Sequence, residues 1–125
     1  MRQRRNVSSE SEFETAVGYS RAVRVGPYVV VSGTTAPGDT IADQAREALR
    51  RIETALVQAG ASLSDVVRTR MFVTDISRWR EVGAVHADVF GQIRPAATMV
   101  EVSALISPEL MVEIEVDAVI EEERE

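Results

Sequence analysis

Two segments near the C-terminus decide the fold: Arg94-Pro95-Ala96-Ala97-Thr98-Met99-Val100-Glu101-Val102 and Val112-Glu113-Ile114-Glu115-Val116. In the second segment, apolar residues alternate with carboxylates. Because successive side chains of a strand point to opposite faces of a sheet, this pattern predicts a strand with one apolar and one charged face. We therefore expect helices to cover only one side of the sheet. The covered face holds Val112, Ile114, Val116, Ala118 and Ile120, and the open face holds Glu113, Glu115 and Asp117.

The rest of the chain predicts further strands and two helices. Thr40 and Asp43 are suited to cap a helix whose apolar residues recur at helical spacing until Gly60 ends it. The order β-β-α-β-α-β-β favours a two-layer α+β domain. The predicted strands are Ala22–Val25, Tyr28–Thr34, Val66–Thr74, Ala97–Val102 and Leu110–Ile120, and the second helix runs from about Ser77 to Gly91.

Alternation and helical spacing also assign faces within two of these elements. The strand that begins at Val66 is expected to place Val67, Thr69, Met71 and Val73 on the covered face, and Arg68, Arg70 and Phe72 on the open face. The second helix is expected to place Trp79, Val82, His86, Val89 and Phe90 on one apolar face. His86 is thus interpreted as a packed core histidine rather than a catalytic one.

A length of 125 residues fits one domain, which we place at residues 13–120, between a flexible tail (1–12) and an acidic tail (121–125). No apolar run is long enough to cross a bilayer, and the basic start lacks the apolar core of a secretory signal, so a cytoplasmic protein that does not bind membranes is expected. The net charge of −6 argues against a nucleic-acid partner.

The amino-acid composition limits the chemistry available to the chain. The sequence has no cysteine, and all 14 of its basic residues are arginine, which excludes thiolate and lysine nucleophiles from this chain. A single histidine, His86, does not make a multi-histidine metal site within one subunit. We expect neither a metal nor a cofactor.

The two C-terminal segments closely resemble the signature of the Rid family, the reactive intermediate deaminases also known as YjgF or L-PSP endoribonuclease-like proteins. In that signature, Pro-Ala is followed by an arginine, a small residue, an apolar run and a Glu-Ile-Glu strand. The resemblance covers about residues 18–120. It implies a chorismate mutase-like α+β fold, a homotrimer, and clefts for a small metabolite between neighbouring subunits.

The resemblance also implies roles for individual residues. Tyr19, in Gly18-Tyr19-Ser20, is expected to position a ligand or water, and Glu115 to orient the hydrolytic water. Each has a structural alternative: Tyr19 as a half-buried aromatic with a solvated hydroxyl, and Glu115 as an ion-pair partner of Arg68 or Arg70. The expected ligand-binding positions are Ser32, Gly33, Thr34, Phe90 and Ala97.

Ala97 stands where the signature has its arginine. In the family, that guanidinium binds the substrate carboxylate, and a methyl group has no donors with which to replace it. Arg94, Arg24 or an arginine of a neighbouring subunit are alternatives for this role, although Arg94 lies an odd number of strand residues away and so points to the other side.

Three functions follow as hypotheses. The first is hydrolytic deamination of a reactive enamine or imine that lacks the usual carboxylate, without metal or cofactor. The second is a non-catalytic trimer that binds a small, relatively apolar metabolite. The third and weakest is an endoribonuclease, which the acidic net charge and the packed histidine disfavour.

Overall fold

The structure, a computed structural model, describes residues 3–121. Its elements follow one another as β1 (Arg4–Val7), α1 (Glu12–Val17), β2 (Ala22–Val25), β3 (Tyr28–Thr34), α2 (Ile41–Gln58), the 3-10 turn η1 (Leu63–Asp65), β4 (Val66–Val73), a second 3-10 turn η2 (Ile76–Arg78), α3 (Trp79–Phe90), β5 (Ala96–Glu101) and β6 (Val112–Val119).

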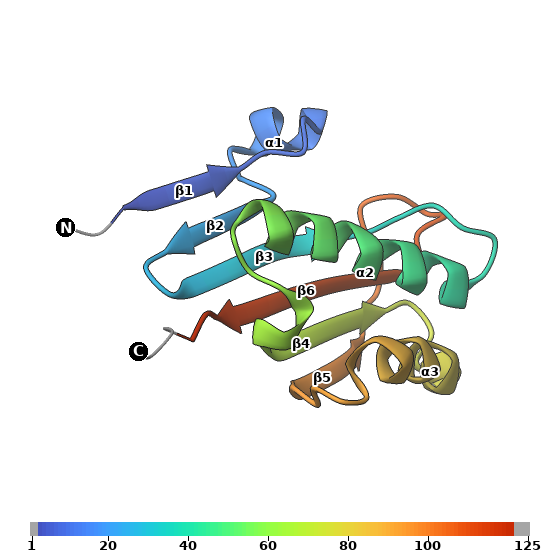
Figure 1. The fold of residues 1–125 in the computed structure, drawn as a ribbon. Helices are drawn as coiled ribbons and strands as arrows, with labels where there is room; N and C mark the ends of the chain where they lie inside the picture. The colour runs from blue at the N-terminus through green and yellow to red at the C-terminus, as the bar shows by residue number, and fades with distance from the viewer. Residues whose placement is uncertain (1–2, 122–125) are drawn as a thin grey trace.

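The described strands form one six-stranded sheet in the order β1-β2-β3-β6-β4-β5 (Figure 1). Neighbours run antiparallel except β4 and β5, which are parallel and are joined through α3. Parallel neighbours require such a crossover, whereas β2 and β3 are joined directly as a hairpin. The predicted order β-β-α-β-α-β-β is confirmed from β2 to β6, and the domain is a two-layer α+β fold.

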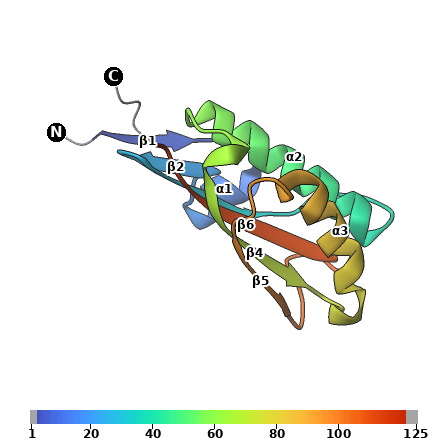
Figure 2. The same cartoon turned by 60° about the horizontal axis from the view of Figure 1, so that its bottom comes forward.

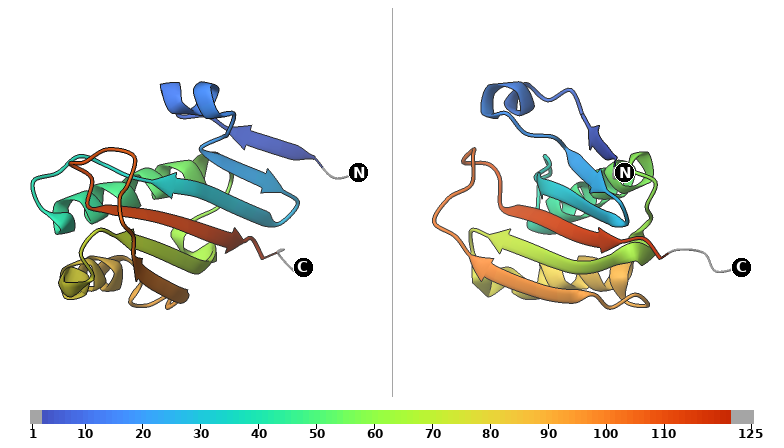
Figure 3. Two further views of the ribbon diagram at one scale, coloured as in Figure 1. Left: turned by 180° about the vertical axis from the view of Figure 1, so that it is seen from behind. Right: turned by 90° about the vertical axis from the view of Figure 1, so that its left-hand side faces the viewer.

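Helices α2 and α3 lie on the same side of the sheet, and the opposite face carries neither of them (Figures 2 and 3). Strand β6 follows the predicted alternation, with Val112, Ile114 and Val116 fully buried beneath the helices. Burial of this apolar stripe against the helices contributes to the stabilisation of the fold, together with the other buried residues of the core.

Helix α2 begins and ends where the sequence predicted. The Thr40 hydroxyl accepts a hydrogen bond from the Asp43 backbone N–H at 3.1 Å, which satisfies one of the free donors of the first turn. Its inward stripe includes Ile41, Leu49 and Ile52, all 2% exposed or less. Gly60, at φ +87°, supplies the left-handed residue that follows the helix end.

The N-terminal segment differs from the prediction. Residues before position 12 show no periodic pattern and were predicted to form a flexible tail, but strand β1 pairs with β2 from Arg4, opposite Val25, to Val7, opposite Ala22. A four-residue edge strand is too short for alternation to reveal it, and its pairing comes from β2 rather than from its own composition. The predicted acidic tail falls almost entirely on residues 122–125, outside the described part of the chain.

Two side chains lie on the opposite side from the one predicted. The pairing of β4 with β6 shifts between Val66 and Arg68, so Val66 is buried whereas Val67 is 48% exposed. Such an irregularity inserts one residue and reverses the alternation that precedes it. Trp79, which is the first residue of α3 and follows η2, is 47% exposed, whereas Val82 and Phe90 of the same helix are buried.

Candidate functional site

Strand β3 contains a bulge at Ser32 and Gly33, next to β6. Val31 is opposite Val116 and Thr34 is opposite Ile114, so three steps along β3 match two along β6. The Glu113 carboxylate lies against Gly33, where a Cβ atom would displace it. Gly33 was predicted to leave room for a ligand close to the backbone. In a single chain, the Glu113 side chain occupies that room.

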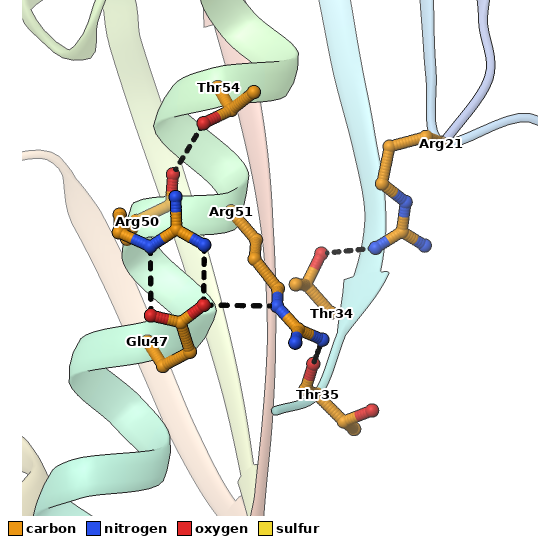
Figure 4. A network of polar contacts seen from close by, with 7 residues as sticks. All are labelled: Arg21, Thr34, Thr35, Glu47, Arg50, Arg51 and Thr54. Carbon is orange, nitrogen blue, oxygen red and sulfur yellow. Dashed lines mark hydrogen bonds and ion pairs between the residues drawn. The ribbon is translucent and has the colours of Figure 1, made fainter. Parts of the chain in front are cut away.

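Arg21, which the sequence analysis did not single out, connects the residues around this bulge (Figure 4). Its Nη1 donates to Thr34 Oγ1 at 2.7 Å and its Nη2 to the Gly33 carbonyl at 3.1 Å. Its guanidinium carbon lies 5.9 Å from the centre of the Tyr19 ring, and its carbonyl accepts from the Ser32 N–H at 3.0 Å. The signal available in the sequence was its position two residues after Tyr19, at the start of a strand.

The hydroxyls of Ser32 and Thr34 already have partners within the chain. Ser32 Oγ donates to the Ser20 carbonyl at 2.6 Å. Thr34 is 1% exposed, and its Oγ1 donates to the Ser32 carbonyl at 2.8 Å while accepting from Arg21. The buried side chain of Thr34 thus contacts Arg21 within one chain, and a ligand contact for Thr34 stays a prediction.

The carboxylates of β6 differ in their surroundings on the open face. Burial raises the pKa of Glu113, the neighbouring charge of Glu115 raises it further, and Arg21 opposes both. Glu115 and Asp117 each accept from Arg70 Nη1 at 3.4 Å. Glu115 thus pairs with Arg70, as its structural interpretation predicted. Glu113 is the carboxyl group whose pKa is raised by its surroundings in the fold.

The remaining predicted ligand-binding positions lie away from the bulge. Ala97 is exposed on β5, opposite Thr69 of β4, so both β4 and β6 separate it from β3. Phe90 is 1% exposed in the core and packs on the His86 ring at a centroid distance of 4.8 Å. Within one chain Phe90 is a core residue on the apolar face of α3, and a ligand contact for it stays a prediction.

His86 is packed between α3 and the sheet, as its position in the helix predicted. Its Nε2 lies 2.8 Å from Thr69 Oγ1, and Thr69 is fully buried. Burial lowers the pKa of His86, so the ring is neutral at physiological pH. A neutral imidazole with this partner fits a structural role.

The two arginines considered as substitutes for the family arginine have other surroundings. Arg24 donates from Nη1 to the Ala59 carbonyl at 3.0 Å and from Nε to the Gly26 carbonyl at 3.0 Å, which ties it to the end of α2. Arg94 is exposed in the turn before β5 and has a positive φ of 55°. Within one chain, neither of them lies beside Tyr19.

Residues 3–121 contain neither a candidate metal site nor a helix that could cross a membrane. Within that range, no three His, Cys, Asp or Glu side chains are grouped closely enough to hold a metal ion. The helices of the same range include none with the length and apolar character needed to span a bilayer.

The comparisons with known proteins agree with the fold. The family model described as Endoribonuclease L-PSP matches residues 9–120. The chain belongs to this family, the Rid or YjgF family. Among solved Rid-family structures, a YjgF/YER057c/UK114 member from Mycobacterium tuberculosis is 71% identical, with a TM-score of 0.94 over 94% of this chain and 100% of that one.

Curated Rid-family relatives are more distant. A RutC family protein from Pyrococcus horikoshii is 33% identical over 78% of this chain and 82% of its own length. A Salmonella typhimurium protein named 2-iminobutanoate/2-iminopropanoate deaminase is 31% identical over 83% of this chain and 89% of its own.

Proposed function

We propose that this Rid-family protein is a homotrimer that hydrolyses a small imine or enamine to a carbonyl compound and ammonia, in clefts between its subunits. The proposal rests on one observation: within one chain, the family's site residues are divided between two separate parts of the strand order of the sheet. Tyr19 and the Ser32-Gly33 bulge lie on the β2–β3 side, whereas Ala97 lies on the edge strand β5. A neighbouring subunit that brings its β5 edge to the bulge would complete one site.

The chemistry around the bulge supports hydrolysis without a metal. Water adds to the imine carbon, a proton is transferred to the nitrogen, and the carbon–nitrogen bond then breaks to release ammonia. Glu113 is suited to the proton transfers, since burial raises its pKa and so brings proton uptake and release closer to neutral pH. Tyr19 and Glu115 would hold the water and the substrate. One relative is named for deamination of 2-iminobutanoate and 2-iminopropanoate.

Position 97 determines which substrates this cleft accepts. Ala97 presents an exposed methyl group where the family signature has a guanidinium. We therefore propose that the substrate has no carboxylate at that end of the cleft. A substrate with a carboxylate there would bind more weakly, because Ala97 cannot donate the charge-assisted hydrogen bonds that an arginine would.

Ammonia release from freshly generated imines tests this proposal. The substrates are 2-iminopropanoate, 2-iminobutanoate and an uncharged imine of similar size. Wild type should prefer the uncharged imine, and Ala97→Arg should raise kcat/KM for the two imino acids by roughly tenfold or more. Ala84→Arg adds the same charge at an exposed position of α3 and should change neither rate. If ammonia is released from these imines no faster with the protein than without it, deamination is contradicted, and a monomer in sedimentation equilibrium would contradict the shared cleft.

The ion pair of Glu115 favours a second candidate, a trimer that binds a small metabolite without turnover. Because Arg70 already contacts Glu115 and Asp117, the carboxylate nearest to the family's catalytic position is partly neutralised. A ligand that raises Tm without ammonia release in wild type would support this candidate. Recovery of turnover in Arg70→Gln would show that the ion pair is what suppresses catalysis.

A further inference from the structure

A cavity of about 640 Å³ lies within a single chain, between the N-terminal segment 8–13, the end of β3 and the outer surface of α2. This volume falls in the range of roughly 300–1,000 Å³ that small-molecule sites occupy. Among residues 3–121, one acidic residue lines it, Glu10, whereas three arginines do: Arg21, Arg50 and Arg51. The cavity touches the candidate active site through Tyr19 and Gly33.

Two of the three arginines that line the cavity, Arg50 and Arg51, share one carboxylate, that of Glu47 (Figure 4). Glu47 accepts from Arg50 Nε at 2.8 Å and from Arg51 Nε at 3.3 Å. The hydrogen bond from Arg50 lowers the pKa of Glu47 to about 2, so this carboxylate stays ionised over the working pH range. The side chains of Arg50 and Arg51 are 63% and 45% exposed, which suits residues that attract an anion from solution.

Arg51 is held more firmly than a surface arginine of an isolated helix. Its Nη1 donates to the Thr35 carbonyl at 3.1 Å, which bridges α2 to the end of β3. Its Nη2 has no hydrogen-bond partner among residues 3–121. The guanidinium is therefore oriented in advance, with donors left for a ligand.

Arg21 forms the inner wall of the same cavity. Two of its nitrogens donate to Thr34 and Gly33, but its Nε is buried and has no partner in the described part of the chain. A buried donor without an acceptor is costly, and such groups in folded proteins call for an explanation. The hydroxyls of Tyr19 and Thr35 line the cavity and are donors with no side-chain partner among the described residues.

We propose that this cavity binds the anionic oxygen group of a small metabolite, a carboxylate or a phosphate, between Arg21 on the inner wall and Arg51 at the mouth. Arginine presents planar pairs of donors that match both groups. The site requires neither a second subunit nor turnover, so it goes beyond the proposed function. An anion bound here lies beside Tyr19 and next to Gly33. Strands β6 and β4 separate this position from Ala97 on β5.

Calorimetric titration with three small probes tests the proposal. Inorganic phosphate and 2-oxobutanoate carry the two candidate anions, and butanone is the uncharged counterpart of 2-oxobutanoate. At low ionic strength, wild type should bind at least one anion and not butanone. Which anion binds more tightly distinguishes a phosphate ligand from a carboxylate ligand. The Arg21→Gln variant should bind the preferred anion roughly 10- to 100-fold more weakly than wild type. The Arg51→Gln variant, which changes a more exposed arginine, should bind that anion about three- to fivefold more weakly than wild type.

Arg46→Gln is the matched control. Arg46 lies on α2 and is paired with Asp43 at 3.3 Å, but it does not line the cavity. It should bind as wild type does, since it loses the same charge outside the site. If Arg46→Gln weakens binding as much as Arg51→Gln, or if neither anion binds wild type, the proposal is wrong. If Arg21→Gln fails to fold, undiminished binding in the folded Arg51→Gln variant still contradicts it. None of these readouts depends on ammonia release.

Discussion

The β3 bulge and the edge strand β5 differ in the positive charge that they carry. At the β3 bulge, Arg21 is partly buried and donates to Thr34 and Gly33 beside Tyr19. On β5, where the family signature has its arginine, Ala97 is exposed and uncharged. The difference shows that the absence of a cation at the signature position does not remove cations from the site region, because Arg21, in the bend before β2, supplies one.

The two regions also differ in what surrounds their polar groups. Beneath β4 and β5, Thr69 and the neutral His86 form a single buried hydrogen bond among apolar side chains. Around the β3 bulge, buried and half-buried charges of both signs are connected by hydroxyls and backbone groups. The first region is therefore core, in which truncation costs packing, and the second is a polar network, in which substitutions act through charge and pH.

Truncation of Phe90 should give the largest effect and sets the two regions apart. Phe90→Ala removes a ring that is 1% exposed, and we expect it to reduce the free energy of unfolding by about 3–5 kcal/mol in urea denaturation. Phe13→Ala is the control, since Phe13 lies on α1 at the cavity and is 44% exposed. It should cost far less. A Phe90→Ala variant that kept its stability but lost ligand binding would restore the ligand role expected from the sequence.

Much of the fold could be predicted from the sequence because long periodic elements determine it. The helical spacing through α2 and the strict alternation of β6 are visible in the residues themselves. The alternation of β4 failed at Val67, where one inserted residue reverses the faces, and β1 is too short for a period. Irregularities of this kind depend on the partner strand, which a single segment does not reveal.

The candidate site was less predictable for the same physical reason. Tyr19, Ser32 and Gly33 were found by resemblance, and the structure brings them together with Arg21. Arg21 was missed because it becomes a site residue only when the β3 bulge turns Thr34 and the Gly33 carbonyl toward it. Glu113 was predicted only to lie on the open face, since burial against Gly33 is what distinguishes it from the other carboxylates of β6.

A second prediction tests whether the polar network supports the bulge side of the molecule. Glu14 is 7% exposed and accepts hydrogen bonds from Ser8 Oγ and from the backbone and hydroxyl of Ser9. Burial raises the pKa of Glu14, but these hydrogen bonds and the charge of Arg21 outweigh it and leave the pKa below its usual 4.5. Glu14→Gln should reduce the stability at pH 7 by about 1–3 kcal/mol, which urea denaturation would measure.

The pH dependence gives the sign of the Glu14 effect. A carboxyl group with a lowered pKa in the folded state stabilises the fold above its unfolded pKa, and this contribution is lost as the pH falls through the folded value. The difference between wild type and Glu14→Gln should therefore be largest at neutral pH and shrink below about pH 4.5. A difference that stayed constant with pH would show that Glu14 acts through packing rather than charge. Glu12→Gln, an exposed change on the same helix, is the control.

The smallest expected effect has the opposite sign and concerns Glu113. Because the pKa of Glu113 is raised, chiefly by burial, the folded state binds a proton more readily than the unfolded chain. Stability contributed by the protonated form is present at low pH and is lost as the pH rises from the unfolded pKa through the folded one. Glu113→Gln should match the Tm of wild type near pH 4 and exceed it slightly at pH 7. Glu115→Gln, which loses the contact with Arg70, should show no such gain. If Glu113→Gln is instead less stable than wild type at pH 7, the charge of Arg21 stabilises the ionised carboxylate of Glu113. Glu113 then acts as a fixed charge beside the bulge rather than as a group that exchanges protons.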